Sequence, residues 1–246
     1  MNEFRNRNEQ FNQRAWSPQT DVWAAHAART AAEATTAERM SFVRKVYALF
    51  FAATLFAVGG VALGFVYPPL MMAVAAHPWI SLFALLGGVV AAQAVRHVPG
   101  VNLFALFAFT TLTGAIISPA IYLYSQINPA SLVQAGLLTV GIFGGLTAYV
   151  FITKRDFSFM RGMLMTGLIV MVLAVVVNIF MASSAFSFAI AAASLLLFSG
   201  FVLYDTSNII RRYPTNEYVA GALSLYLDAF NIFLALLRLL NGGNRN

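Results

Sequence analysis

Two aspartates stand inside long apolar segments of this 246-residue chain, where an ionised carboxylate is costly. Asp228 lies near the middle of the last apolar run, and Asp205 lies near the end of the run before it. An aspartate at the centre of a membrane helix costs about 2.5–3.5 kcal/mol on insertion scales. Such residues usually face the interior of a bundle and mark ion or proton pathways. A purely structural role, as hydrogen-bonding partners of neighbouring helices, is the alternative.

The spacing of the two aspartates predicts that they meet. The polar loop around residues 213–217 separates the two runs and is nearly equidistant from both acids. In an antiparallel helical hairpin each carboxyl group would lie roughly 12–16 Å from that turn. Two carboxylates in a low-dielectric site resist joint ionisation and can share one proton, so they titrate as a unit. This is the basis of a pH switch, because a protonated pair holds the two helices together and an ionised pair repels.

Other polar residues are candidates for the same pathway. The last run places its polar and small residues on one helical stripe, which comprises Gly221, Ser224, Asp228, Asn231, Ala235 and Arg238. Asn208, one turn after Asp205, and Asn178 in the fifth run are further pore-lining candidates. Arg96 closes the second run and is a candidate latch for the aspartate pair. An interfacial arginine that snorkels to water is the alternative for Arg96.

The composition places these residues in a membrane. Hydrophobic residues make up 60% of the chain and charged residues 10%, against about 45–50% and 25% in soluble domains. A soluble domain of this length cannot bury so much apolar surface. The net charge of +6 comes mostly from residues outside the apolar runs, so we expect no nucleic-acid partner. The absence of cysteine from the sequence excludes disulfides and thiolate metal sites.

Seven apolar runs divide most of the chain, and each approaches the roughly 20 residues that cross a bilayer as a helix. Their predicted spans are about 46–66, 79–96, 101–124, 131–153, 161–182, 185–209 and 218–240. The sequence therefore predicts an all-α integral membrane protein with a seven-helix transmembrane domain over residues 42–246. Residues 1–41 are polar and alanine-rich, and we expect them to form a largely disordered or weakly helical cytoplasmic tail.

Two further patterns predict how the helices are oriented and packed. Lys and Arg precede the first helix and occur at the breaks after helices two, four and six, whereas the loops after helices one, three and five contain neither. By the positive-inside rule this predicts a cytoplasmic N-terminus and an external C-terminus. GxxxG spacings at Gly60–Gly64 and Gly141–Gly145 predict close helix packing within the chain rather than a dimer seam.

The sequence offers no enzyme site. The three histidines His26, His77 and His97 have no metal-ligand spacing, and no Walker A motif or nucleophile elbow is present. We therefore expect no structural metal, no cofactor and no enzymatic activity. An intramembrane aspartyl protease would require a GxGD motif, whereas the second aspartate of this chain lies in LYLD.

The residues around both aspartates resemble the Bax inhibitor-1 family, in its bacterial branch. The strongest match is the block from 203 to 240, which carries LYD in one run and LYLD in the next. Two further matches are TGAIISPAIYLY at 113–124 and TKRDFSFMRGML at 153–164. The resemblance covers about residues 42–240. It implies a seven-helix fold in which the last helix is central and surrounded by the other six.

The resemblance also implies a function, namely a pH-sensitive calcium leak in the bacterial inner membrane. In this interpretation Asp205 and Asp228 form the pH sensor and gate, Arg96 engages them, and calcium binds the pair only transiently. The expected partners are calcium ions, protons and the lipid bilayer. The alternative is a non-transporting regulator of stress tolerance or membrane-protein quality control. Such a regulator would bind a membrane protease or another integral protein through residues 1–41.

Overall fold

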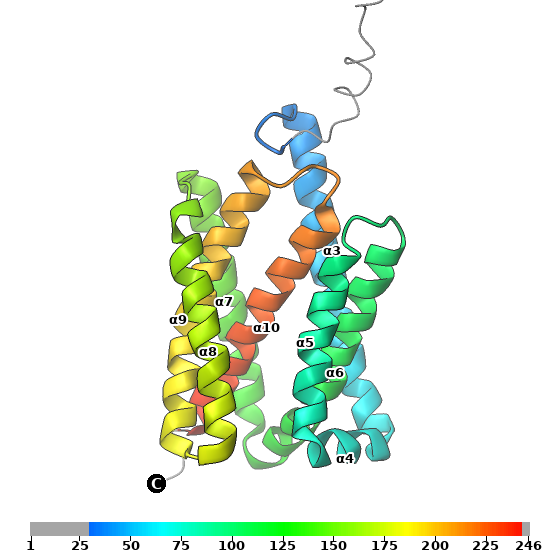
Figure 1. The fold of residues 1–246 in the computed structure, drawn as a ribbon, viewed down its shortest axis with the longest axis vertical. Helices are drawn as coiled ribbons and strands as arrows, with labels where there is room; N and C mark the ends of the chain where they lie inside the picture. The colour runs from blue at the N-terminus through cyan, green and yellow to red at the C-terminus, as the bar shows by residue number, and fades with distance from the viewer. Residues whose placement is uncertain (1–29, 243–246) are drawn as a thin grey trace, which may run out of the picture.

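The computed structural model describes residues 30–242, which form a bundle of helices (Figure 1). The long helices are α3 (Thr36–Val66), α6 (Val101–Ile127), α7 (Pro129–Thr153), α8 (Arg161–Met181), α9 (Ser184–Arg211) and α10 (Tyr218–Gly242). The shorter elements are α4 (Pro68–Ala76), α5 (Pro78–Ala94) and the 3-10 turn η1 (Ser158–Met160). Between residues 30 and 242, six helices are long and apolar enough to cross a membrane, and α4 with α5 makes a seventh if this bent pair is one span. The predicted all-α multi-pass architecture is confirmed.

Helix α10 is the centre of the bundle. In its most apolar 18-residue window 61% of the residues are buried, against 6–39% in the other long helices. It packs against α3, α6, α7 and α9 and runs diagonally through the bundle (Figure 1). The prediction of a central last helix is confirmed. The expectation that all six other helices surround it was wrong, because within residues 30–242 α5 packs on α4 and α6, and α8 packs on α9 and η1.

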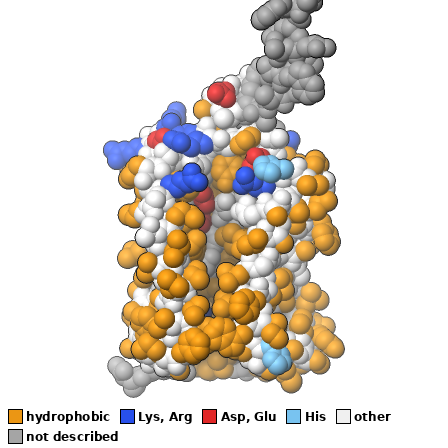
Figure 2. Space-filling model, in the orientation of Figure 1, with side chains coloured by type: hydrophobic (Ala, Val, Ile, Leu, Met, Phe, Trp, Pro, Cys, Tyr) orange, Lys and Arg blue, Asp and Glu red, His pale blue; other side chains and the backbone are white. Residues whose placement is uncertain are grey.

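Basic side chains gather at one end of the bundle, which we call the basic end (Figure 2). The start of α3, the α5–α6 loop, the α7–α8 loop and the α9–α10 loop lie there (Figure 1). The Lys and Arg residues of these segments include Arg44, Lys45, Arg96, Lys154, Arg155, Arg211 and Arg212. The opposite end, which we call the neutral end, holds α4 and the turns that join α6 to α7 and α8 to α9.

Helix α3 begins at Thr36, well before the predicted position 46 and inside the segment assigned to the tail. A capping box starts it: the Thr35 hydroxyl accepts from the backbone N–H of Glu38, and the Glu38 carboxylate accepts from that of Thr35 at 2.9 Å. Just before this cap, Ala31 N–H donates to Tyr213 O at 2.9 Å and Ala32 N–H to Arg211 O at 3.2 Å. The end of the predicted tail is therefore attached to the α9–α10 loop, and residues 1–29 lie outside the described residues.

The segment between the first two predicted spans is a helix and not a loop. Both α4 and α5 carry proline in their first turn, Pro68 with Pro69 and Pro78 respectively, where the missing N–H costs nothing. The residues before them, Tyr67 and His77, have ψ of 79° and 65°, outside the helical region that a following proline disfavours. Two consecutive proline-led starts thus produce a bend of 97° between α4 and α5.

Helices α3 and α6 cross in backbone contact at glycines. A Cβ atom built on Gly60 would overlap the carbonyl oxygen of Thr111, and one built on Gly114 would overlap that of Ala57. This confirms that the first GxxxG spacing packs within the chain. The same prediction was wrong for Gly141 and Gly145, because a Cβ at either position would meet no atom within 4 Å.

Candidate functional site

The two aspartates lie together on the α9–α10 hairpin. The carboxyl groups of Asp205 and Asp228 are within hydrogen-bonding reach of each other. Asp228 is 3% exposed, and Asp205 is half-buried. Ionised carboxylates only accept hydrogen bonds, so this contact is favourable when a proton lies between them. The Oδ2 atom of Asp228 has no other donor among residues 30–242, and a shared proton would satisfy it.

A tyrosine from the α9–α10 loop covers the pair on the side of the basic end. The hydroxyl groups of Tyr213 and Ser224 hydrogen-bond at 3.2 Å, which fixes the tyrosine one turn above Asp228. Burial and the nearby charge of Asp205 raise the pKa of Tyr213 to about 12. The phenol therefore stays protonated at neutral pH.

A run of buried polar residues follows Asp205 along α9. Thr206 and Ser207 are 0% exposed and Asn208 is 6% exposed. The backbone carbonyl of Asn208 accepts from the N–H groups of Arg212 and Tyr213 at 2.7 and 3.0 Å, which ends the helix. Of the predicted pore-lining residues, Asn208 is thus buried three residues after Asp205, and Ser224 lies one turn before Asp228.

Two other candidates are engaged elsewhere. The Asn178 amide donates to Ser187 Oγ at 2.6 Å across the α8–α9 turn, at the neutral end of the bundle. The Asn231 amide donates to the carbonyl of Leu227 in its own helix at 2.8 Å. The stripe on α10 is otherwise directed inward, since Gly221, Asp228 and Ala235 are buried, but its last member Arg238 is exposed.

Arg96 faces the α9–α10 loop instead of the aspartate pair. Its Nε lies 4.0 Å from Oε2 of Glu217 and donates to His97 Nε2 at 2.9 Å. His97 Nδ1 in turn lies 3.4 Å from Glu217 Oε1. Glu217 starts α10, since its carbonyl accepts from the N–H of Gly221. Among the ion pairs of the described residues, Arg96 therefore has none with Asp205 or Asp228, as the predicted latch would require. It pairs instead with Glu217, whose partly solvated carboxylate lies at the same end.

Sequence reasoning missed a second link to α10. The hydroxyl groups of Thr113 on α6 and Tyr226 on α10 hydrogen-bond, and both residues are at most 2% exposed. They lie in the TGAIISPA and LYLD segments that carry the family resemblance. That co-occurrence was the available signal, but a search for ionisable residues does not find uncharged hydroxyls.

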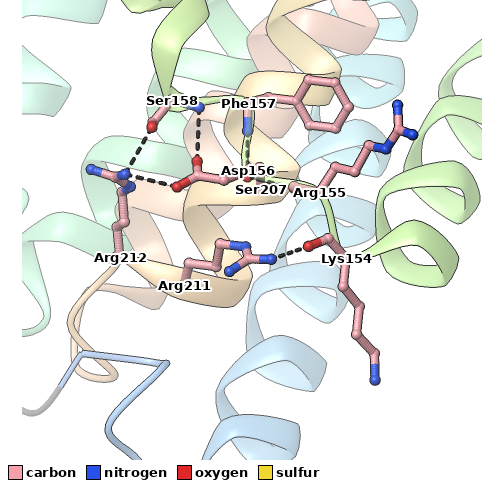
Figure 3. Close-up of polar contacts among 8 residues, drawn as sticks. All are labelled: Lys154, Arg155, Asp156, Phe157, Ser158, Ser207, Arg211 and Arg212. Atoms are coloured by element: carbon pink, nitrogen blue, oxygen red, sulfur yellow. Dashed lines mark hydrogen bonds and ion pairs between the residues drawn. The ribbon is translucent and has the colours of Figure 1, made fainter.

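The α7–α8 loop is attached to the end of α9 by a network at the basic end (Figure 3). The carboxylate of Asp156 accepts from the backbone N–H of Ser158 and from Arg212 Nη2, each at 2.9 Å. Arg211 donates to the carbonyl of Lys154. Ser207 accepts from the N–H of Phe157 at 3.2 Å. The α9 segment that carries Asp205 is therefore held at its outer end by a second loop.

Substitution of Asp156 by asparagine is expected to lower stability slightly, in a pH-dependent way. The Ser158 N–H and then the Arg212 guanidinium lower the pKa of Asp156 from 3.8 to about 2. A lowered pKa contributes stability above the unfolded-state value, and this contribution is lost as the pH falls from about 4 towards 2. Because the carboxylate is exposed and screened, we expect a loss below about 1 kcal/mol at neutral pH. Thermal unfolding of both proteins between neutral pH and pH 2 measures it, and a deficit that persists at pH 2 would contradict the assignment.

A hollow opens on one face of the bundle, with the α8–α9 pair on one side of it and the α5–α6 pair on the other (Figure 2). Basic side chains flank its mouth on both sides at the basic end, and acidic atoms are visible within it. Hydrophobic side chains cover the same face towards the neutral end. Since α5 and α8 do not pack on α10, this face is where the central helix is least covered.

The chain is similar to proteins from bacteria and eukaryotes. The family model described as inhibitor of apoptosis-promoting Bax1 matches residues 39–246. Protein lifeguard 4 of Mus musculus is 36% identical over 217 residues, which are 87% of this chain and 90% of that protein. Bax inhibitor 1 of Schizosaccharomyces pombe is 34% identical over 221 residues, covering 85% and 79% respectively.

Bacterial relatives match as well. A membrane protein of Vibrio cholerae is 42% identical over 142 residues, which are 57% of this chain and 63% of that protein. A Helicobacter pylori protein is 34% identical over 204 residues, 82% of this chain and 87% of that protein. The family match covers α3 to α10 and includes the α9–α10 hairpin that carries both aspartates. The chain is a multi-pass membrane protein and belongs to the Bax inhibitor-1 family.

Proposed function

We propose that this protein is a pH-sensitive calcium leak channel whose gate is the Asp205–Asp228 pair. The observation that carries the proposal is the contact between two carboxyl groups at the centre of the bundle, which requires a proton. The pair joins α9 to the most buried helix, α10, so its protonation acts on the contact between them. A membrane carboxylate that merely packed would be expected to find a neutral donor, which Asp228 Oδ2 lacks within residues 30–242.

Gating follows from the charge on the pair. At mildly acidic pH one proton bridges the carboxyl groups and holds α9 against α10. When that proton leaves at higher pH, two negative charges in a low-dielectric site repel each other, and α9 and α10 separate. The same two carboxylates are hard oxygen ligands, which calcium prefers, so the opened pair offers a transient calcium site. An ion would reach it through the hollow at the basic end (Figure 2).

We further propose that the protein lies in the bacterial inner membrane with its basic end in the cytoplasm. The grouping of Lys and Arg at that end supports this orientation through the positive-inside rule. The N-terminal residues are then cytoplasmic and the C-terminus external. The pair would accordingly sense cytoplasmic pH, because the hollow opens towards the basic end.

Calcium flux into liposomes tests the proposed function. Purified protein is reconstituted, and the entry of external calcium is followed with a trapped dye between about pH 6 and 8. Liposomes without protein provide the background at each pH. We expect flux above that background which increases as the pH rises. Flux equal to the background at every pH would overturn the proposal.

Replacement of Glu217 by glutamine is expected to increase the leak at acidic pH. The change removes the ion pair with Arg96 and weakens the contact with His97, which together attach the end of α5 to the start of α10. Exposed ion pairs contribute about 0.2–1 kcal/mol, so we expect an increase of up to about fivefold. Asp156→Asn is the matched control, since it removes an ion pair at the same end that does not touch α5 or α10. An unchanged leak in E217Q would show that this contact does not restrain the gate.

The second candidate function is a non-transporting membrane regulator. The names of the relatives favour it: one is Bax inhibitor 1 of S. pombe, and another is the Golgi anti-apoptotic protein of vaccinia virus, 30% identical over 217 residues. Residues 1–29 would be the handle for a partner protein. Deletion of residues 2–28 keeps the Thr35 cap and the contacts of Ala31 and Ala32 intact. Loss of partner binding with unchanged calcium flux would favour the regulator, and loss of flux would count against it.

A further inference from the structure

A long apolar groove lies between α3 and α7, on the opposite side of α10 from α8 and α5 (Figure 1). Its volume is about 670 Å³, and its floor is formed by Tyr226, Ala229 and Phe233 of α10. The rim residues Phe51 and Val140 are 63% and 72% exposed, so the groove opens sideways towards the bilayer. It belongs neither to the aspartate pair nor to the hollow beside it.

The groove has the length of a lipid chain. Its wall on α3 extends from Tyr47 to Val61, which corresponds to about 21 Å along the helix axis. One leaflet of the hydrocarbon core is about 15 Å thick, so the groove is long enough to hold one acyl chain. Apart from a few hydroxyl groups, apolar side chains and the glycines Gly136 and Gly144 line it.

The end of the groove nearest the basic end is polar. The Tyr47 hydroxyl lies within hydrogen-bonding reach of those of Thr147 and Thr206. All three oxygen atoms are buried. Tyr47 and Thr147 line the groove, so hydroxyl-bearing residues mark the end of the groove that lies nearest the basic end.

Two cations continue the walls of the groove towards water. The α3 wall uses Tyr47, Phe51 and Thr54, and the same 3–4 spacing reaches Arg44 one turn earlier. The α7 wall uses Thr147, and Lys154 caps the end of the same helix seven residues later. The Tyr47 and Phe151 rings, with centroids 6.1 Å apart, hold these two helix ends together. The Lys154 side chain points away from Asp156 and Arg212, and neither cation has an ion pair with any residue in 30–242 (Figure 3).

We propose that the α3–α7 groove binds one anionic phospholipid of the surrounding membrane. One acyl chain lies in the apolar part, and the phosphate headgroup lies beyond Tyr47 and Thr147, between Arg44 and Lys154. Basic positions between membrane helices recognise anionic headgroups in this way. The lipid would pack directly against α10, the helix that carries Asp228. The inference does not depend on calcium conduction.

Native mass spectrometry of the purified full chain tests this site. The protein in detergent is titrated with palmitoyl-oleoyl phosphatidylglycerol or with the matching phosphatidylcholine. Gly144→Phe places a ring in the groove, whereas Gly145→Phe places the same ring on the exposed surface beside it; a Cβ at either position meets no atom within 4 Å. We expect G145F to bind one phosphatidylglycerol as the wild type does. We expect G144F to bind it at least about tenfold more weakly, since loss of two methylene contacts already has that effect.

The headgroup is tested separately. Arg44→Gln and Lys154→Gln are each expected to reduce the preference for phosphatidylglycerol over phosphatidylcholine by about fivefold, and Arg161→Gln, on α8, to leave it unchanged. Thermal unfolding verifies that each variant folds. If G144F does not fold, Gly136→Leu is the second variant that fills the same groove. Equal binding of lipid by G144F and G145F would overturn the groove as the site. No preference for the anionic lipid in the wild type, or loss of a protein dimer instead of a lipid in G144F, would overturn the proposed occupant.

Discussion

Simultaneous replacement of Asp205 and Asp228 by asparagine is expected to abolish the pH dependence of calcium flux. Asparagine keeps the size and hydrogen-bonding capacity of aspartate but cannot ionise, so the α9–α10 contact no longer responds to protons. One proton coupled to a two-state gate changes the ratio of open to closed protein by up to about tenfold per pH unit. Between about pH 6 and 8 the wild type should therefore respond by up to about 100-fold, and the double variant should not respond.

The control for this experiment is another acid of the same chain. Asp156 lies outside the spanning helices, and its pKa of about 2 keeps it ionised over the whole range of the flux assay. Asp156→Asn should therefore retain the full pH response. If both D205N/D228N and Asp156→Asn keep the wild-type pH response of calcium flux, the aspartate pair is not the pH sensor.

A second large effect is expected at the crossing of α3 and α6. Gly60→Ala and Gly114→Ala each place a methyl group on a backbone carbonyl of the facing helix, at Thr111 and Ala57 respectively. No rotamer change relieves a clash with backbone, so we expect a loss of about 3 kcal/mol in stability, the upper end of the usual range for overpacking. The bundle is expected to unfold at a clearly lower temperature in detergent.

Gly59→Ala is the matched control for both substitutions. It lies next to Gly60 on α3, but its Cβ would meet no atom within 4 Å. Alanine there removes the conformational freedom of glycine, so we expect equal or slightly higher stability, by up to about 1 kcal/mol. Equal unfolding temperatures for Gly59→Ala and Gly60→Ala would show that the two helices are not in backbone contact.

The membrane spans could be predicted because each depends on local composition. The predicted spans from the third to the seventh differ from α6, α7, α8, α9 and α10 by at most three residues at either end. The start of α3 could also have been found, since Thr35 and Glu38 form a capping box that is legible in the sequence TTAE. It was missed because this motif lies in a polar, alanine-rich stretch that lacks the apolar signal of a span.

The meeting of Asp205 with Asp228 could be predicted because a hairpin relates their depths. The partner of Arg96 could not be predicted, since nothing in the sequence distinguishes Glu217 from other solvated acids in loops. The attachment of Ala31 to Tyr213 is likewise non-local, and it uses backbone groups that carry no sequence signal. The α3–α7 groove depends on two helices that are separated by more than sixty residues and held at a distance by α10, which no local pattern encodes.

The proposed gate depends on one proton that Asp205 and Asp228 share, and infrared spectroscopy can observe this proton in the liposomes used for flux. Protonated carboxyl groups have a C=O stretching band that carboxylates lack. We predict a band that disappears as the pH rises, with the same midpoint as the increase in calcium flux. This band should be absent from the D205N/D228N double variant. A shared-proton gate would be contradicted by a flux that changes with pH while this band does not. It would also be contradicted by a band that remains in the double variant with its titration unchanged.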